Sequence, residues 1–152
     1  MKPCFRFLNN HIDADRVKKH LSPPIFVSSI NDAYINYDVI DTKSGIYFIV
    51  SKNYKFIYPK GNSPLIYIGK ADNLRRRLKE HLTNFRNATP KDSWIYSRYN
   101  YMNMPGGFEI YYLTSITNEK SKYLESRAIE DFYDRYLATP VGNGAFSFRK
   151  RY

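Results

Sequence analysis

Two short tyrosine-glycine triplets, each within an apolar run, constrain the fold of this chain more than any other feature. The triplet GIY occupies residues 45–47 and opens the run GIYFIVS, and the triplet YIG at 67–69 closes the run that begins at Leu65. Compact apolar runs of this kind are typical of buried strands. With a polar turn between them, they predict an antiparallel hairpin whose connection is longer than hairpins usually need.

A basic amphipathic helix is predicted directly after the second triplet. Asp72 or Asn73 is placed to cap it. Arg77 and His81 are four residues apart, so they share a helix face beside the apolar stripe and can point into a cleft at the sheet edge. Arg75 and Arg76 are rotated away from that face; without the strands, the whole basic run also fits a solvated helix surface. The apolar stripe at helical spacing consists of Leu74, Leu78, Leu82 and Phe85.

The remaining pattern predicts an α+β fold with a small antiparallel three-stranded sheet flanked by helices. Residues 108–113 alternate as the third strand, and residues 33–40 are β-prone without clean alternation. Helices are predicted over 12–21, 92–102 and 119–137. We expect one domain, with an N-terminal extension (1–44) packed on a core (45–144) and a basic C-terminal tail (145–152).

The charge of the chain favours a polyanionic partner. The 152 residues include 24 Lys and Arg but only 14 Asp and Glu, which gives a net charge of +10. Such a surplus favours binding to phosphates, because their neutralisation releases counterions. The same surplus is also compatible with solubility alone. The single cysteine, Cys4, excludes an intrachain disulfide and a cysteine-cluster zinc site. Because no stretch resembles a signal peptide or membrane span, we expect no membrane association and a cytoplasmic location.

In their order and spacing, these motifs resemble the GIY-YIG nuclease family. In that family an arginine follows the second glycine by eight residues, and a histidine or tyrosine stands four further on; Gly69, Arg77 and His81 match this spacing. The family also carries a glutamate on a later helix and an asparagine in the turn after it. Glu125 and Asn143 resemble these two residues.

The resemblance implies a role for each matching side chain. Tyr47 would act as general base on the attacking water, with His81 receiving or sharing its proton. The cationic surroundings of Arg77 and Lys70 would favour a phenolate at Tyr47. Arg77 would hold the scissile phosphate and offset its developing charge, and Tyr67 would hydrogen-bond the phosphate or the nucleophile.

Glu125 would bind one divalent cation, Mg²⁺ or Mn²⁺, to stabilise the leaving 3′ oxygen. Asn143 would support this geometry or a metal-bound water. Further candidates for substrate binding are Gly45, Gly69, Lys70, Arg75 and Arg76.

Structural alternatives stand beside these roles. A strand tyrosine usually serves packing, and an asparagine in a Gly-Asn-Gly turn is favoured for backbone reasons alone. Glu125 competes with other carboxylates of the same segment, namely Glu119, Glu130 and Asp131. Its position four residues before the apolar Ile129 favours an inward orientation.

The leading hypothesis is therefore a metal-dependent DNA endonuclease of a free-standing restriction or phage type. The connection SKNYKFIYPKGNSP at 51–64 is basic and aromatic, which suits contact with DNA. A homodimer is possible if both strands are cut together. The alternatives are a catalytically inactive nucleic-acid-binding module of the same fold and, less favoured, a structural protein with an incidental basic surface.

Overall fold

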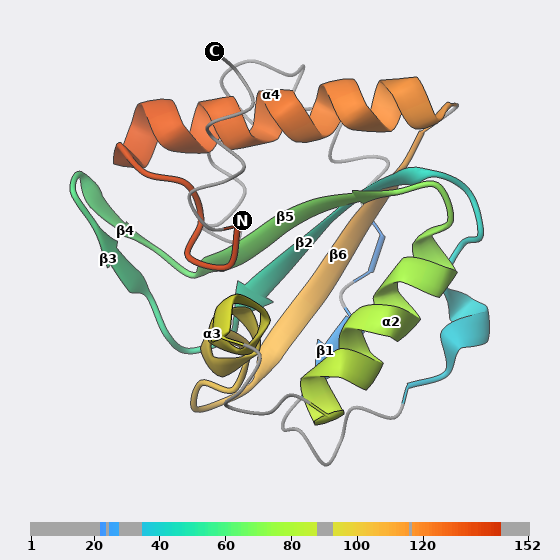
Figure 1. Ribbon diagram of the computed structural model, residues 1–152, viewed down its shortest axis with the longest axis horizontal. Coiled ribbons are helices and arrows are strands. Elements are labelled where there is room, and N and C mark those ends of the chain that lie inside the picture. The colour runs from blue at the N-terminus through green and yellow to red at the C-terminus, as the bar shows by residue number, and fades with distance from the viewer. Residues whose placement is uncertain (1–21, 24, 28–34, 88–92, 116, 144–152) are drawn as a thin grey trace.

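Four antiparallel strands form the central sheet of the protein (Figure 1). The computed structural model describes residues 22–23, 25–27, 35–87, 93–115 and 117–143. The strand order is β1-β6-β2-β5, and β3 pairs with β4 in a separate two-stranded sheet. The strands are β1 (Ile25–Val27), β2 (Gly45–Ser51), β3 (Phe56–Tyr58), β4 (Gly61–Ser63), β5 (Leu65–Ala71) and β6 (Phe108–Thr114). The helices are η3 (Tyr37–Val39), α2 (Leu74–Asn87), α3 (Ser93–Met102) and α4 (Asn118–Tyr136).

The two triplets lie on neighbouring strands, which confirms the predicted hairpin. β2 and β5 pair antiparallel in a register that sets Tyr47 opposite Gly69. On its other side β2 pairs with β6, where Tyr47 lies opposite Tyr112. Every residue of β2 is buried, since the strand is paired on both sides and is also packed against α4 and α2. The first triplet therefore sits in the interior of the sheet, and the second lies on its edge strand.

The predicted count of three strands is wrong, because β1 adds a fourth. β1 pairs with β6 and sets Phe26 opposite Glu109. A three-residue strand is too short to show a period-2 pattern in the sequence. The connection between β2 and β5 also contains the β3–β4 hairpin, which accounts for its unusual length.

The β-prone prediction for 33–40 is also wrong over the part that is described. Residues 37–39 form η3, a single 3₁₀ turn. The Asn36 side chain accepts a hydrogen bond from the backbone N–H of Asp38 at 3.1 Å. A short polar side chain thereby offers the backbone a local partner and competes with strand pairing. The helix predicted over 12–21 lies outside the described residues.

Helix α2 follows its predicted pattern closely. All four residues of its apolar stripe are buried, and the helix ends near its last member, Phe85. Of the two candidate caps, Asn73 is the one that acts, since its Oδ1 accepts from the backbone N–H of Arg76 at 3.0 Å. The stripe orients α2 so that the flanking face, with His81, turns toward the strands.

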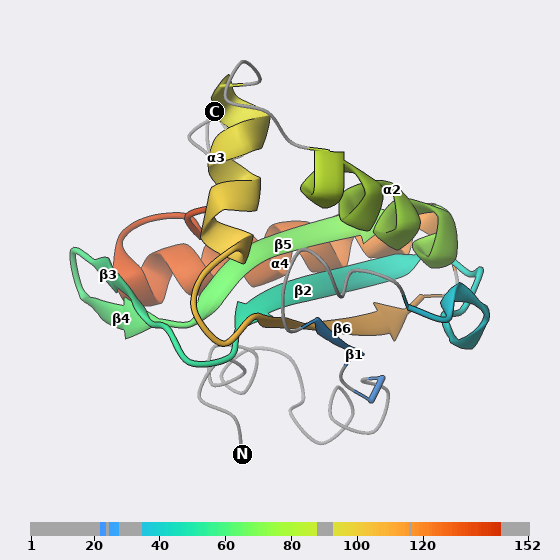
Figure 2. The ribbon, with the colours of Figure 1, turned by 90° about the horizontal axis from the view of Figure 1, so that it is seen from below.

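The helices are arranged around the sheet so that α2 and α3 rise from one face (Figure 2). α4 packs along β5 and β2 (Figure 1). It begins after Thr117, whose side chain accepts from the N–H of Lys120 at 3.1 Å, and it ends at Leu137 in a left-handed conformation. Ala128, Ile129 and Phe132 bury its inner face. Within the described residues, no helix has the length and apolar character needed to cross a bilayer.

Candidate active site

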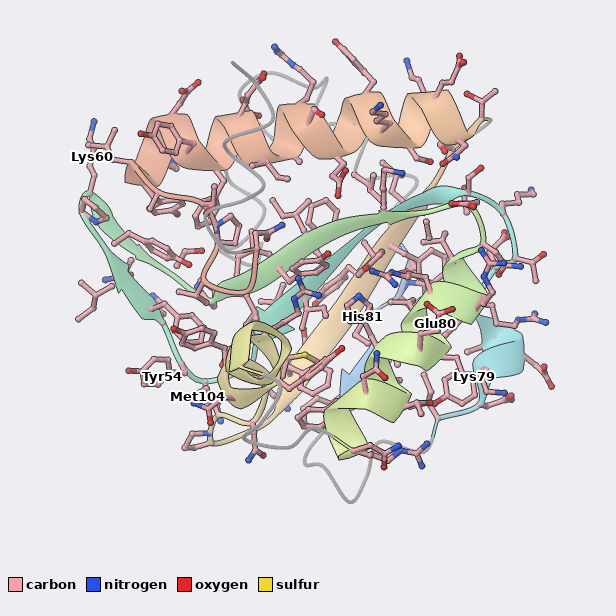
Figure 3. All side chains as sticks on the ribbon, viewed as in Figure 1. Tyr54, Lys60, Lys79, Glu80, His81 and Met104 are labelled. Atoms are coloured by element: carbon pink, nitrogen blue, oxygen red, sulfur yellow. The ribbon has the colours of Figure 1, made fainter. Side chains whose placement is uncertain are left out.

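A buried hydrogen bond joins the tyrosine of the first triplet to the histidine of α2. Tyr47 Oη lies 2.6 Å from His81 Nε2, and the two rings meet at a steep angle with centroids 5.4 Å apart. His81 points from α2 toward the strands, whereas Lys79 of the same helix points away (Figure 3). Tyr47 is 0% and His81 2% exposed. The sheet and α2 therefore bring a phenol and an imidazole together in the interior of the protein.

Both members of this pair are uncharged near neutral pH. Burial raises the pKa of Tyr47 well above its ordinary value, and the nearby Tyr67 adds to the rise, while Arg77 opposes it. Burial and the positive charges of Arg77 and Arg98 lower the pKa of His81 to about 3. The expectation that surrounding cations favour a phenolate is thus not met in the free protein. Desolvation of the buried phenol outweighs the charge of Arg77.

The low pKa of His81 makes the stability of the protein depend on pH. An unfolded histidine titrates at about 6.5, whereas the pKa of folded His81 is about 3. Between these values the unfolded chain binds a proton that the folded protein does not, so the free energy of unfolding falls as the pH decreases. We expect a loss of about 1 kcal/mol per pH unit below pH ~6.5.

Urea unfolding of the wild type and of His81→Gln at about pH 7.5, 6 and 5 measures this contribution. The variant lacks the titrating ring, so its stability should fall less steeply with acid. If the free energy of unfolding falls equally steeply with acid in the two proteins, His81 is not the source of the pH dependence.

Only glycine fits beside the Tyr47 hydroxyl. A Cβ atom at Gly69 would lie 2.4 Å from Tyr47 Oη and 2.6 Å from the ring of Tyr67. The rings of Tyr47 and Tyr67 have centroids 5.8 Å apart. The glycine of the second triplet therefore lets both phenols approach the backbone of β5. Gly45 serves packing inside the sheet, since a Cβ there would lie 2.2 Å from the carbonyl oxygen of Leu113.

An open pocket of about 360 Å³ lies where β5, the start of α2 and α4 meet. It brings together Tyr67, Lys70, Arg77 and Glu125, which the sequence predicted as site residues. The fully buried Tyr47 lies behind this wall, next to Tyr67. The complete wall consists of Tyr67, Lys70, Ala71, Asp72, Asn73, Arg76, Arg77, Glu80 and Glu125.

The three consecutive arginines of α2 have different surroundings. Arg77 pairs with Glu80 at 3.1 Å in the pocket wall. Arg76 also lies in the wall and is 3.7 Å from Asp72, in a pair that is mostly exposed and therefore weak. Arg75 instead donates to the carbonyl oxygens of residues 40 and 38 at 3.0 and 3.1 Å. It thus holds the segment around η3 and stands outside the pocket.

The donor set of the pocket fits a hard divalent cation that takes some of its ligands from the protein and others from a substrate. Mg²⁺ commonly binds through one or two carboxylates, retained waters and phosphate oxygens. Glu125 offers a carboxylate in the pocket wall, beside cationic groups suited to phosphate. In the part of the chain that the structure describes, no cluster of three or more His, Cys, Asp or Glu side chains forms a complete metal site. A cation held at Glu125 would therefore take its other ligands from water and substrate oxygens.

Asn143 holds the second triplet from the outer edge of the sheet. Its Oδ1 accepts from the N–H of Ile68 at 2.9 Å, and its Nδ2 donates to the carbonyl oxygen of Ile68 at 2.8 Å. Gly142 N–H donates to the carbonyl oxygen of Ile66 at 2.7 Å. The turn after α4 thereby occupies the place of a neighbouring strand along the edge strand β5. The buried amide positions the YIG backbone and is not part of the pocket wall.

Replacing Asn143 with aspartate tests this positioning role. The carboxylate can still accept from the N–H of Ile68 but has no N–H for the Ile68 carbonyl oxygen. We expect a loss of about 1–3 kcal/mol in the free energy of unfolding, because a buried acceptor is left unpaired. Urea denaturation measures it, with the exposed Asn87→Asp as matched control. A loss no larger than that of the control would contradict the role.

Arg98 of α3 is a residue of the site that sequence reasoning missed. Its guanidinium lies over the ring of Tyr67, 4.2 Å from the centroid, and its Nε donates to the carbonyl oxygen of Gly142 at 2.8 Å. It therefore links α3, Tyr67 and the turn that carries Asn143. The only sequence signal for Arg98 was that it is a lone arginine in a predicted helix. Helix α3 lies outside the spacing pattern of the family motifs, so nothing in that pattern pointed to Arg98 as a site residue.

Comparison with known proteins identifies the family. The model of the GIY-YIG catalytic domain matches residues 43–136, which is more than half of the chain. No curated protein and no solved structure gives a significant match. The matched range contains both triplets, α2 with its arginine and histidine, and the part of α4 that carries Glu125. The chain belongs to the GIY-YIG family, and this membership implies a nuclease-type function.

Proposed function

We propose that this protein is a metal-dependent DNA endonuclease that hydrolyses phosphodiester bonds. The strongest support is the buried Tyr47–His81 pair, 2.6 Å between Oη and Nε2. This pair lies next to Tyr67, which shares a pocket wall with Arg77 and Glu125. A phenol with an adjacent proton acceptor, beside cations and a carboxylate, can supply a general base, charge stabilisation and a metal ligand for hydrolysis of a phosphodiester.

In this proposal a water oxygen attacks phosphorus as Tyr47 Oη takes the proton of the water. The phenolic proton passes to His81 Nε2, which is within hydrogen-bond distance. A bound phosphate would offset the charge of Arg77, which is one cause of the low pKa of this imidazole. Tyr47 has no exposed surface in the free protein, so the pocket wall must shift when substrate binds. Arg77 is the side chain best placed to do so, since a phosphate would compete with Glu80 for its guanidinium.

Arg77 and Lys70 then hold the scissile phosphate, with the Tyr67 hydroxyl as a hydrogen-bond partner. Arg77 offsets the charge that builds on the phosphate oxygens in the transition state. Glu125 would hold Mg²⁺ or Mn²⁺, which when bound supplies positive charge for the leaving 3′ oxygen. Asn143 and Arg98 act through Tyr67 and the YIG backbone and are positioning residues.

DNA is the proposed substrate, and the net charge of +10 supports it. A free-standing restriction or phage enzyme remains the role we favour, with a homodimer as the arrangement that would cut both strands together. A binding module that has lost catalysis is less well supported, because every side chain that the proposed chemistry needs is present.

Incubation of the purified protein with supercoiled plasmid and Mg²⁺ tests the proposal. We expect nicked or linear DNA, with the reaction abolished by EDTA and restored by added Mg²⁺ or Mn²⁺. Salt-sensitive DNA binding without turnover on plasmid, phage and branched DNAs would refute the nuclease and support the binding module.

A further inference from the structure

The β3–β4 hairpin stands apart from the main sheet, at the end of β5 remote from α2 (Figure 1). It lies within residues 51–64, a segment with three lysines and no acidic residue. Lys60 projects from it on one side of the molecule, far from Lys79 on α2 (Figure 3). The hairpin is thus a positively charged projection outside the catalytic pocket.

One face of this hairpin is anchored firmly to the body of the protein. The ring of Phe56 packs edge-on against Tyr101, with centroids 5.5 Å apart. Tyr58 packs in the same way on Phe132, 5.2 Å away, and its hydroxyl oxygen accepts from the N–H of Val141 at 3.0 Å. Because these contacts hold both ends of β3, the hairpin presents its other face in a fixed orientation.

The outer face carries an apolar and an amide side chain directly opposite each other. Ile57 pairs with Asn62 across the two strands. Ile57 is 89% exposed, the highest value among the large hydrophobic residues of the described chain. Lys55 and Lys60 flank this pair and are also exposed. An exposed apolar side chain among lysines, with an amide beside it, is the chemistry of a groove-binding element.

We propose that the outer face of the β3–β4 hairpin binds a DNA groove at a distance from the cleaved phosphate and sets where the enzyme cuts. This inference rests on the proposed nuclease function. Asn62 would read a base edge, Ile57 would contact bases, and Lys55 and Lys60 would contact phosphates on either side. A two-stranded ribbon is narrow enough to enter the major groove.

The fold fixes the spacing between this contact and the catalytic pocket. β5 runs from the hairpin toward the start of α2 (Figure 1), where its last residues line the pocket, and its seven residues span about 20 Å. That length equals about six base-pair steps of 3.4 Å in B-form DNA. A duplex laid along β5 therefore meets the hairpin about five to eight base pairs from the scissile bond.

DNA suits this surface better than a second copy of the chain does. Each copy has a net charge of +10, so two hairpins with their lysines would repel each other. One exposed isoleucine between lysines is also not the extended apolar patch that a stable protein interface needs. Phosphates complement the lysines, and the groove accommodates the apolar side chain.

DNA binding is measured in two hairpin variants with Ca²⁺ in place of Mg²⁺. Ca²⁺ prevents cleavage, so the hairpin is tested separately from catalysis. Lys60→Ala should reduce the slope of log affinity against log salt by about 1, and the matched Lys79→Ala should leave it unchanged. Ile57→Ser/Asn62→Ala should weaken binding at preferred sites by about 5- to 100-fold. It should also lose hydroxyl-radical protection about five to eight base pairs from the cut. Thermal unfolding of the variants checks that these exposed substitutions leave folding unchanged.

Unchanged footprints and salt slopes in both hairpin variants would overturn the inference. A shift from dimer to monomer in sedimentation, with the footprint intact, would also overturn it and assign the hairpin to self-association. If the wild type binds DNA without cutting it and the variants still lose affinity and protection, the hairpin contact stands and the nuclease proposal alone fails.

Discussion

Replacing Tyr47 with phenylalanine is expected to lower the single-turnover rate of DNA cleavage by about 10²- to 10⁴-fold, the usual contribution of a general base. The change removes only Oη, so the ring keeps its place in a strand that is buried over its whole length. His81 Nε2 loses its 2.6 Å partner, and we expect a cost of about 1–3 kcal/mol in stability from the unpaired nitrogen. Rapid-quench cleavage with saturating enzyme, together with urea unfolding, separates the two effects.

Tyr112→Phe is the matched control for this substitution. Tyr112 lies directly opposite Tyr47 on β6, and its hydroxyl donates to the carbonyl oxygen of Val39 at 3.3 Å, away from the pocket. Cleavage should be unchanged in this variant. A larger loss in Tyr67→Phe than in Tyr47→Phe would reassign the base to Tyr67, which lines the pocket in the free protein.

Substitution of Glu125 by glutamine should reduce cleavage by about 10³-fold at ordinary Mg²⁺ concentrations, because several kcal/mol of transition-state charge stabilisation depend on the bound cation. Glutamine keeps the size of the side chain and removes its charge, so the pocket shape is retained. DNA affinity should persist, since Lys70, Arg76 and Arg77 still line the pocket. Cleavage rates should be measured across a series of Mg²⁺ and Mn²⁺ concentrations. The variant should need more metal to reach half of its maximal rate, and its rate should recover in part at high metal concentration.

Glu130→Gln is the corresponding control on the same helix. Glu130 pairs with Arg127 at 3.7 Å on a partly exposed surface, so its loss should cost little. Equal cleavage by Glu125→Gln and wild type would show that another group holds the metal. Equal losses in both variants would indicate a general effect on α4.

Much of the site was predictable from local sequence. Strand β2 has the predicted bounds, 45–51, because a compact apolar run bounded by polar residues identifies a buried strand without outside information. Helix α2 shows its buried stripe and its Arg77–His81 face for the same reason, since helical periodicity is a property of neighbouring residues. The prediction that Glu125 joins these groups came from its match to the family pattern, and the pocket brings it to Tyr67 and Arg77.

Other features depend on contacts between residues far apart in the chain, which no local pattern encodes. β1 is a strand only because β6 supplies its partners, and the β3–β4 hairpin is held by Tyr101 and Phe132 from α3 and α4. Asn143 looks like a turn residue in the sequence, yet its amide pairs with Ile68, 75 residues away.

The sequence by itself determined the two triplet strands, the basic helix after them and the chemical groups available to the site. The tertiary structure alone decided that Tyr47 and His81 are buried and uncharged, that Arg98 lies over Tyr67, and that Arg76, unlike Arg75, lies in the pocket wall. The reason is physical: residue type and periodicity fix local conformation, whereas pKa values and accessibility depend on the burial and charges that folding assembles around each group.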